Sequence, residues 1–253
     1  MTHSKQFTSY NNLALGRGLM LLLLLSITLL YSTLGSAATL FYAGDYDLNN
    51  PNFDGLANEN DAIVSGSPYG AATYQNFVIP NPYLWHITAL STNNWMSGLT
   101  PRTAYWEIRR GVSDGYGGSV VASGSAVDTL RGGASGIYEH LVTVDVTLVD
   151  SATYWFAVVP QAQGQNGRSF NVNTFGLNGF GTEVRDKQYF NSPYFGSYFK
   201  NADNFGPFPS FSDRAYGTAF IVGGPVPEPS SLVMMGSGAL ALAGGLRRYL
   251  FAK

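Results

Sequence analysis

The chain has 253 residues and a mass of 27.3 kDa, which allows one large domain or two small ones. Charged residues make up 12% of it, about half of the usual ~25%, while aromatic residues reach 14% and cysteine is absent. This composition excludes a coiled coil, a basic nucleic-acid-binding protein, a disulfide-stabilised scaffold, a thiolate metal site and a cysteine nucleophile.

The N-terminal region predicts a secretory signal peptide over residues 1–38. Two basic residues precede an apolar run at 19–30, and a group of small residues ends at Ala38. A positively charged start, an apolar stretch of about 7–15 residues and a small-residue cleavage site are the three parts of such a signal. We therefore expect signal peptidase to cleave after Ala38, so that the exported chain begins near Thr39.

The C-terminal region predicts a processed tail over residues 226–253. Its parts, in order, are Val226, Pro227, Glu228 and Pro229, an apolar stretch at 231–246, and the basic pair Arg247 and Arg248. Two prolines one residue apart cannot join a helix or a sheet, so the motif should be extended and accessible. The apolar stretch would form a helix about 24 Å long at ~1.5 Å per residue, shorter than the ~30 Å hydrocarbon core of a bilayer. It suits transient membrane insertion, with the arginines on the cytoplasmic side.

This ending resembles the PEP-CTERM sorting signal of Gram-negative bacteria. The resemblance rests on Pro227-Glu228-Pro229, the short glycine-containing apolar segment, and the basic pair Arg247 and Arg248. It implies that a membrane-embedded exosortase recognises the motif and removes the tail. It also implies a host that makes extracellular polysaccharide. The sequence departs from many members in that Tyr249-Leu250-Phe251 follow the arginines.

The region between these signals, residues 39–225, predicts one all-β domain. Residues 141–149 alternate between apolar and polar side chains, as in a half-buried strand, whereas residues 153–159 are apolar on both faces and predict a central strand. Further strands are expected at 39–43, 73–79, 84–91, 104–110, 119–126, 168–174 and 215–222. Turn clusters rich in glycine and asparagine separate them. The pattern favours a single β-sandwich, jelly-roll-like in topology.

The same alternation predicts the orientation of individual side chains. In the strand around Trp106, this tryptophan should point inward, and Glu107 and Arg109 should point outward. Trp155 lies in the strand that is apolar on both faces and is expected in the core. Trp95 is expected to be exposed.

Two patterns with catalytic associations are interpreted as structural. Residues 111–115 match the G-x-S-x-G nucleophile elbow, which needs a helix directly after the serine. A glycine-rich segment and a predicted strand follow instead, so we expect a hairpin turn. The exported region has two histidines, His86 and His140, and neither has a partner at the spacing of a metal site.

An Asp- and Asn-rich stretch leaves two interpretations open. Asp45, Asp47 and Asp54 could supply the alternating oxygen ligands that calcium prefers. However, Asn50 replaces the glycine of an EF-hand loop, and Leu56 occupies the position of its bidentate glutamate. Because Asp and Asn also dominate ordinary turns, we favour a turn and keep calcium as the alternative. No other cofactor is expected.

Carboxylates and aromatic residues leave further alternatives. Glu107, Glu139 and Glu183 are candidates for the carboxylate pair of a glycosidase, although the sequence does not show which of them face each other. The aromatic-rich segment at 189–211 could stack on sugar rings. We favour the interpretation that it packs onto the sandwich as a long loop.

The sequence therefore predicts an exported, non-enzymatic protein at the cell surface or in the extracellular matrix. The leading interpretation is a structural or adhesive component associated with exopolysaccharide. A carbohydrate-binding module is the second, and a glycan-active hydrolase is the third. Exposed aromatic residues would favour the second, and two facing carboxylates in a cleft would favour the third. Residues 39–226 carry nine basic and fifteen acidic residues, a net charge of −6, so nucleic acid is not an expected partner.

Overall fold

A computed structural model describes residues 37–46, 55–60, 66–97, 103–161 and 168–221. Residues 37–224 form one compact unit. The described residues are all-β, with two antiparallel sheets and no α-helix, so the predicted fold class is confirmed. No helix within the described residues is long and apolar enough to cross a membrane. The predicted sorting helix lies outside the described residues.

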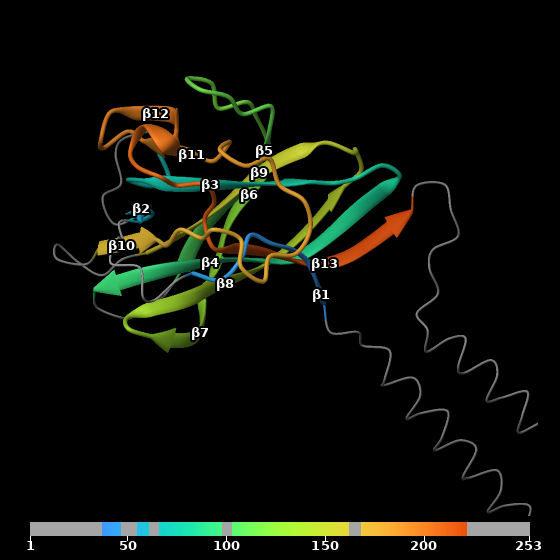
Figure 1. Cartoon of the computed structure of the whole chain (residues 1–253), viewed down its shortest axis with the longest axis horizontal. Helices are drawn as coiled ribbons and strands as arrows, with labels where there is room; N and C mark the ends of the chain where they lie inside the picture. Colours follow the sequence, from blue (N-terminus) through green and yellow to red (C-terminus); the bar gives the residue numbers. More distant parts are fainter. Residues whose placement is uncertain (1–36, 47–54, 61–65, 98–102, 162–167, 222–253) are drawn as a thin grey trace, which may run out of the picture. The chain divides into compact units, whose positions relative to one another are not determined.

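The two sheets lie one above the other in Figure 1. The larger sheet contains β1 (Ala38–Tyr42), β13 (Asp213–Ile221), β4 (Tyr83–Ser97), β10 (Arg168–Asn171), β2 (Leu56–Ala57), β8 (Ile137–Leu148) and β7 (Thr129–Ala134). The smaller sheet has the order β12 (Ser197–Asn201), β11 (Tyr189–Ser192), β3 (Ala72–Val78), β9 (Thr153–Pro160), β5 (Thr103–Arg110) and β6 (Ser119–Val127). A 3-10 helix, η2 (Ala202–Asn204), follows β12. The arrangement is β-sandwich-like, and its likeness to a jelly roll stays a prediction.

All nine predicted strands are present, with shifted ends. The largest shift is in β4, expected at 84–91, which continues to Ser97 because β10 pairs with its second half. Residues 111–118 connect β5 to β6 without a helix, and Ser113 pairs with Tyr116 in an isolated bridge, so the G-x-S-x-G motif lies in a hairpin turn as expected.

The main core lies between the two sheets. Phe41, Ile87 and Val142 from the larger sheet pack with Phe77 and Phe156 from the smaller one. A second apolar cluster lies on the other face of the smaller sheet and includes residues of β3, β9, β11 and β12. β9 lies between β3 and β5, as predicted for a central strand. One of its faces, with Phe156, belongs to the main core, and the other, with Trp155, belongs to the second cluster.

The second cluster overturns the predicted orientation of β5. Glu107 is buried and Arg109 is largely buried, although both were expected to point outward. Trp106 is half-buried against the main core instead of fully enclosed. The physical reason is that alternation predicts which residues share a face but not whether a further layer covers that face. Here Tyr74 and Phe199 belong to that layer.

The segment at 189–211 is also more regular than expected. It forms the hairpin β11–β12 and η2, and β11 pairs with β3, so it extends the sheet. Its aromatic residues divide into buried ones, such as Tyr189 and Phe211, and exposed ones, such as Tyr194 and Tyr198.

Trp155 provides a direct test of the double-faced packing of β9. The side chain is 8% exposed, and its Nε1 donates a hydrogen bond to the carbonyl of Lys187 at 2.7 Å. We expect Trp155→Ala to lower the free energy of unfolding by about 3–5 kcal/mol, because it leaves a cavity and removes the shorter of two side-chain hydrogen bonds to the Lys187 carbonyl. Trp95→Ala, at a position 37% exposed, should cost much less. Equal unfolding midpoints for the two variants in denaturant would contradict the assignment of β9.

Candidate ligand-binding site

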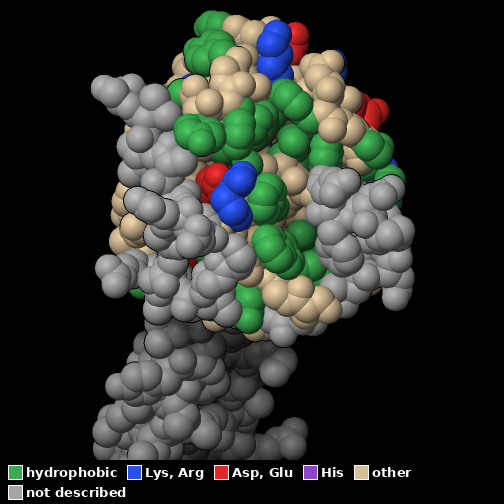
Figure 2. Space-filling view, turned by 90° about the vertical axis from the view of Figure 1, so that its left-hand side faces the viewer, with side chains coloured by type: hydrophobic (Ala, Val, Ile, Leu, Met, Phe, Trp, Pro, Cys, Tyr) green, Lys and Arg blue, Asp and Glu red, His purple; other side chains and the backbone are tan. Residues whose placement is uncertain are grey.

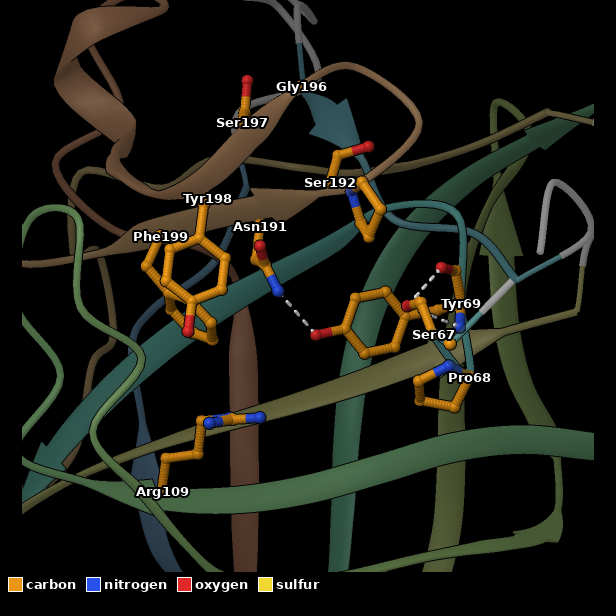
Figure 3. A pocket seen from close by; sticks show the side chains of 12 residues that line it. Ser67, Pro68, Tyr69, Arg109, Asn191, Ser192, Gly196, Ser197, Tyr198 and Phe199 are labelled. Carbon is orange, nitrogen blue, oxygen red and sulfur yellow. Dashed lines mark hydrogen bonds between the residues drawn. The ribbon is translucent and has the colours of Figure 1, made fainter. Parts of the chain in front are cut away.

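A pocket of about 420 Å³ opens beside the β11–β12 hairpin. Its lining residues come from four places: the segment before β3 (Gly66, Ser67, Pro68, Tyr69), β5 (Arg109), β11 and the turn after it (Asn191, Ser192, Pro193, Gly196), and β12 (Ser197, Tyr198, Phe199). This volume lies within the range of about 300–1,000 Å³ found for small-molecule sites. Figure 3 shows Tyr69 and Asn191 facing each other, with Arg109 below them.

Arg109 lines the pocket and is bound by the buried carboxylate of Glu107, and these two residues are called the pocket floor below. Glu107 accepts hydrogen bonds from Tyr74, from Tyr105 at 2.9 Å, and from Arg109 Nε and Nη2 at 2.7 and 3.1 Å. The guanidinium of Arg109 also lies 4.9 Å from the ring centroid of Phe199. Burial alone would lower the pKa of Arg109, but its hydrogen bonds to Glu107 outweigh this and raise it, so the guanidinium stays charged.

The hydrogen bonds above the carboxylate have a fixed direction. Tyr74 donates its one proton to Glu107, so in the 2.6 Å bond between the two tyrosines Tyr69 must be the donor. Asn191 Nδ2 then donates to the hydroxyl oxygen of Tyr69 at 2.9 Å. Burial and the negative charge of Glu107 raise the pKa of Tyr69 to about 12. Tyr69 is therefore a neutral hydrogen-bonding group at physiological pH and not a phenolate nucleophile.

Exposed aromatic residues surround the hairpin. Tyr194, Phe195, Tyr198 and Phe205 all present large parts of their rings to solvent. The rings of Tyr194 and Phe195 pack edge to face, with centroids 4.8 Å apart. Figure 2 shows hydrophobic side chains gathered on this side of the domain around a basic and an acidic side chain. Aromatic side chains are usually buried, so such a group indicates a contact surface.

The three candidate glutamates lie in three separate networks. Glu107 is bound as described above, and Glu139 accepts hydrogen bonds from Ser91 and Tyr216, each at 2.7 Å. Glu183 accepts from Gln75 and Ser210, and burial raises its pKa. None of the three pairs with another of them in the described structure. Asp45 and Glu139 do line a common pocket of about 370 Å³ with Arg214.

The two histidines are also apart. His140 is fully buried and its Nδ1 lies 2.7 Å from Asp128, whereas His86 is partly exposed and lies 2.7 Å from Asp145. In the pairing of β4 with β8, His140 is opposite Thr92, six residues from His86, which is about 20 Å along a strand. This agrees with the structural interpretation of both.

The predicted calcium ligands are only partly described. Asp45 accepts hydrogen bonds from Tyr42 and, at 2.7 Å, from Asn178. Asp47 and Asp54 lie outside the described residues. Within the described part of the chain, no group of three or more His, Asp or Glu side chains could hold a metal ion. The calcium interpretation stays a prediction.

The predicted processing sites lie at or beyond the ends of the described domain. Ala38 and Thr39 begin β1, where the chain is exposed or half-exposed. Val226, Pro227, Glu228, Pro229, Arg247 and Arg248 lie outside the described residues.

Sequence reasoning missed the residues that line the pocket. The composition of 189–211 indicated an aromatic surface there, but Tyr69 and Asn191 are 122 residues apart in the chain. No local pattern connects them, because the pairing of β11 with β3 brings them together.

Fold and site together define a β-sandwich-like protein with a polar, aromatic-rimmed pocket. Residues 225–248 match the family model of the PEP-CTERM protein-sorting motif. The chain thus carries the sorting signal of an exosortase substrate, which implies an exported protein processed at the cell envelope. No significant match was found among curated proteins or among solved structures.

Proposed function

We propose that this protein is a structural or adhesive component of the cell surface or extracellular matrix of a Gram-negative bacterium, associated with exopolysaccharide and without catalytic activity. The observation that supports the role most directly is the group of exposed aromatic rings on and beside the β11–β12 hairpin, next to a pocket lined by hydroxyl and amide groups. Aromatic faces combined with a few placed polar groups suit sugar rings, which have apolar faces and hydroxyl edges.

The non-catalytic part of the proposal rests on the pocket floor. Glu107 is held in an ion pair with Arg109 and takes hydrogen bonds from two tyrosines, so its oxygens are engaged by protein groups. Tyr69 is kept protonated. General acid–base chemistry needs a group that is free to exchange a proton with the substrate. Binding is the activity that this arrangement supports.

The aromatic surface can be tested by its removal. Wild-type protein purified from its exporting host should sediment with the extracellular polysaccharide of that host. The triple variant Tyr194→Ala, Phe195→Ala, Tyr198→Ala should lose most of this retention, because the exposed rings that could stack on sugars are removed. Phe195 and Tyr198 also contact the buried rings of Phe190 and Phe199, so the unfolding midpoint of the variant is compared with that of the wild type. The matched control is Phe175→Ala, Phe180→Ala, at two exposed aromatic residues of another loop. Equal retention of the triple variant and the control would refute the role of the hairpin.

The sorting route leads to a prediction about the mature chain. We expect the exported protein to begin near Thr39, which leaves β1 almost complete, and to lack the C-terminal arginines. Intact-mass measurement on protein from the native host tests both ends. A mass that retains Arg247 and Arg248, in a host with an exosortase, would contradict the proposed processing.

A further inference from the structure

The pocket beside the hairpin offers hydrogen-bonding groups but no unpaired charge. Arg109 is the one charged residue among the described lining residues. Its Nε and Nη2 bind the two oxygens of Glu107, and its Nη1 donates to the carbonyl of Gly117 at 3.0 Å. The positive charge is therefore compensated by a buried carboxylate directly beneath the pocket.

The amide oxygen of Asn191 lacks a hydrogen-bond partner. Asn191 is 6% exposed, and its Nδ2 is committed to Tyr69. Its Oδ1 is buried and accepts no hydrogen bond from any described residue. Buried polar atoms are nearly always paired, so an unpaired acceptor on a pocket wall indicates a donor supplied from outside the protein. Figure 3 shows the Asn191 side chain between Tyr198 and Tyr69, with its nitrogen toward Tyr69.

The walls on either side are flat and apolar. Pro68, Pro193 and Phe199 line the pocket, and Tyr198 contributes a ring that is 60% exposed. A ring at this position can stack on one face of a ligand while Asn191 binds an edge.

We propose that this pocket binds an uncharged sugar ring, with a ligand hydroxyl donating to Asn191 Oδ1 and an apolar face of the ring stacked on Tyr198. The proposal rests on the proposed function, because it names the part of the polysaccharide that the hairpin contacts. A uronate carboxylate fits poorly. The carboxylate would face the acceptor oxygen of Asn191 instead of a hydrogen-bond donor. The described lining residues include no unpaired cation, and residues 39–226 carry a net charge of −6, which repels an anion.

The test compares neutral and acidic oligosaccharides on protein purified from its exporting host. The probes are hexasaccharides of glucose, galactose and mannose, and a hexasaccharide of galacturonic acid, with binding measured by calorimetry. We expect at least one neutral hexasaccharide to bind and the galacturonate probe not to bind. Binding of the galacturonate probe alone would overturn the proposal.

The variants locate the site. Tyr198→Ala should weaken neutral-sugar binding by about tenfold, as expected for a central aromatic contact. Phe175→Ala is the matched control, since Phe175 is similarly exposed but lies on another loop and does not line the pocket. Asn191→Ala should also weaken binding, and its unfolding midpoint shows whether the fold is kept. Equal effects of Tyr198→Ala and Phe175→Ala would overturn the pocket assignment.

The failure of this inference differs from the failure of the proposed function. If the protein binds the host polysaccharide and Tyr198→Ala changes nothing, the pocket assignment fails and the surface role stands. If it binds neither the host polysaccharide nor any of the hexasaccharides, both fail.

Discussion

Replacing Glu107 with glutamine should destabilise the protein by about 3–5 kcal/mol, although the change removes no apolar contact. The variant leaves the Arg109 guanidinium largely buried without its carboxylate, and it weakens the acceptor of Tyr74 and Tyr105. Breaking a buried ion pair from one side is costly because the remaining charge is desolvated and unpaired. Chemical denaturation with fluorescence detection measures the loss.

A second variant separates the charge effect from general damage. In Glu107→Gln, Arg109→Met neither charge of this pair remains, so the double variant should be more stable than Glu107→Gln alone. The matched control is Asp150→Asn, which breaks the exposed pair with Arg110 and should cost about 1 kcal/mol or less. An unchanged unfolding midpoint for Glu107→Gln would show that the pair does not hold the pocket floor.

This prediction also affects how catalysis should be tested. Loss of any activity in Glu107→Gln would accompany a loss of folded structure around the pocket. It would therefore not identify Glu107 as a catalytic group unless the unfolding midpoint of the variant were unchanged.

The strands could be predicted from the sequence because their signal is local. The alternation at 141–149 and the double apolar pattern at 153–159 each depend on one short segment, and β8 and β9 are found there. The sorting signal was predictable for the same reason, since its parts are consecutive. Each of these patterns needs no knowledge of a distant partner.

The pocket could not be predicted because its parts are distant in the chain. Glu107 alternates like a surface residue, and only the aromatic layer over β5, which includes Tyr74 and Phe199, makes it buried. A glutamate in a strand is usually solvated, so burial was the less expected outcome. The aromatic composition of 189–211 was visible, but the division into buried and exposed rings depends on the register of β11 against β3.

A buried acid in the larger sheet should make the stability of the protein depend on pH. Asp213 on β13 is fully enclosed and accepts hydrogen bonds from Asn171 Nδ2 at 3.1 and 3.2 Å. Burial raises its pKa from 3.8 to about 7, and hydrogen bonds from Thr92, Asn171 and the backbone of Asn93 only partly oppose this. The native state therefore keeps a proton that the unfolded state releases.

The sign of the effect follows from proton linkage. Between about pH 4 and pH 7 the native state binds one more proton at Asp213 than the unfolded state does, so stability falls as the pH rises. Above about pH 7 both states are ionised and this contribution becomes constant. From pH 5 to pH 8 the group should remove about 3 kcal/mol, at ~1.4 kcal/mol per pKa unit.

The variant Asp213→Asn should abolish this slope, because asparagine does not ionise. Its absolute stability can differ from that of the wild type, since the amide places a donor where Asn171 also donates. The difference in unfolding free energy between pH 5 and pH 8 is therefore the quantity to compare, measured in denaturant at both pH values. Asp150→Asn, at an exposed side chain paired with Arg110 instead of with a histidine, should leave the wild-type slope almost intact. The same fall in stability for the wild type and for Asp213→Asn would assign the slope to other groups and show that Asp213 is ionised in the native protein throughout this range.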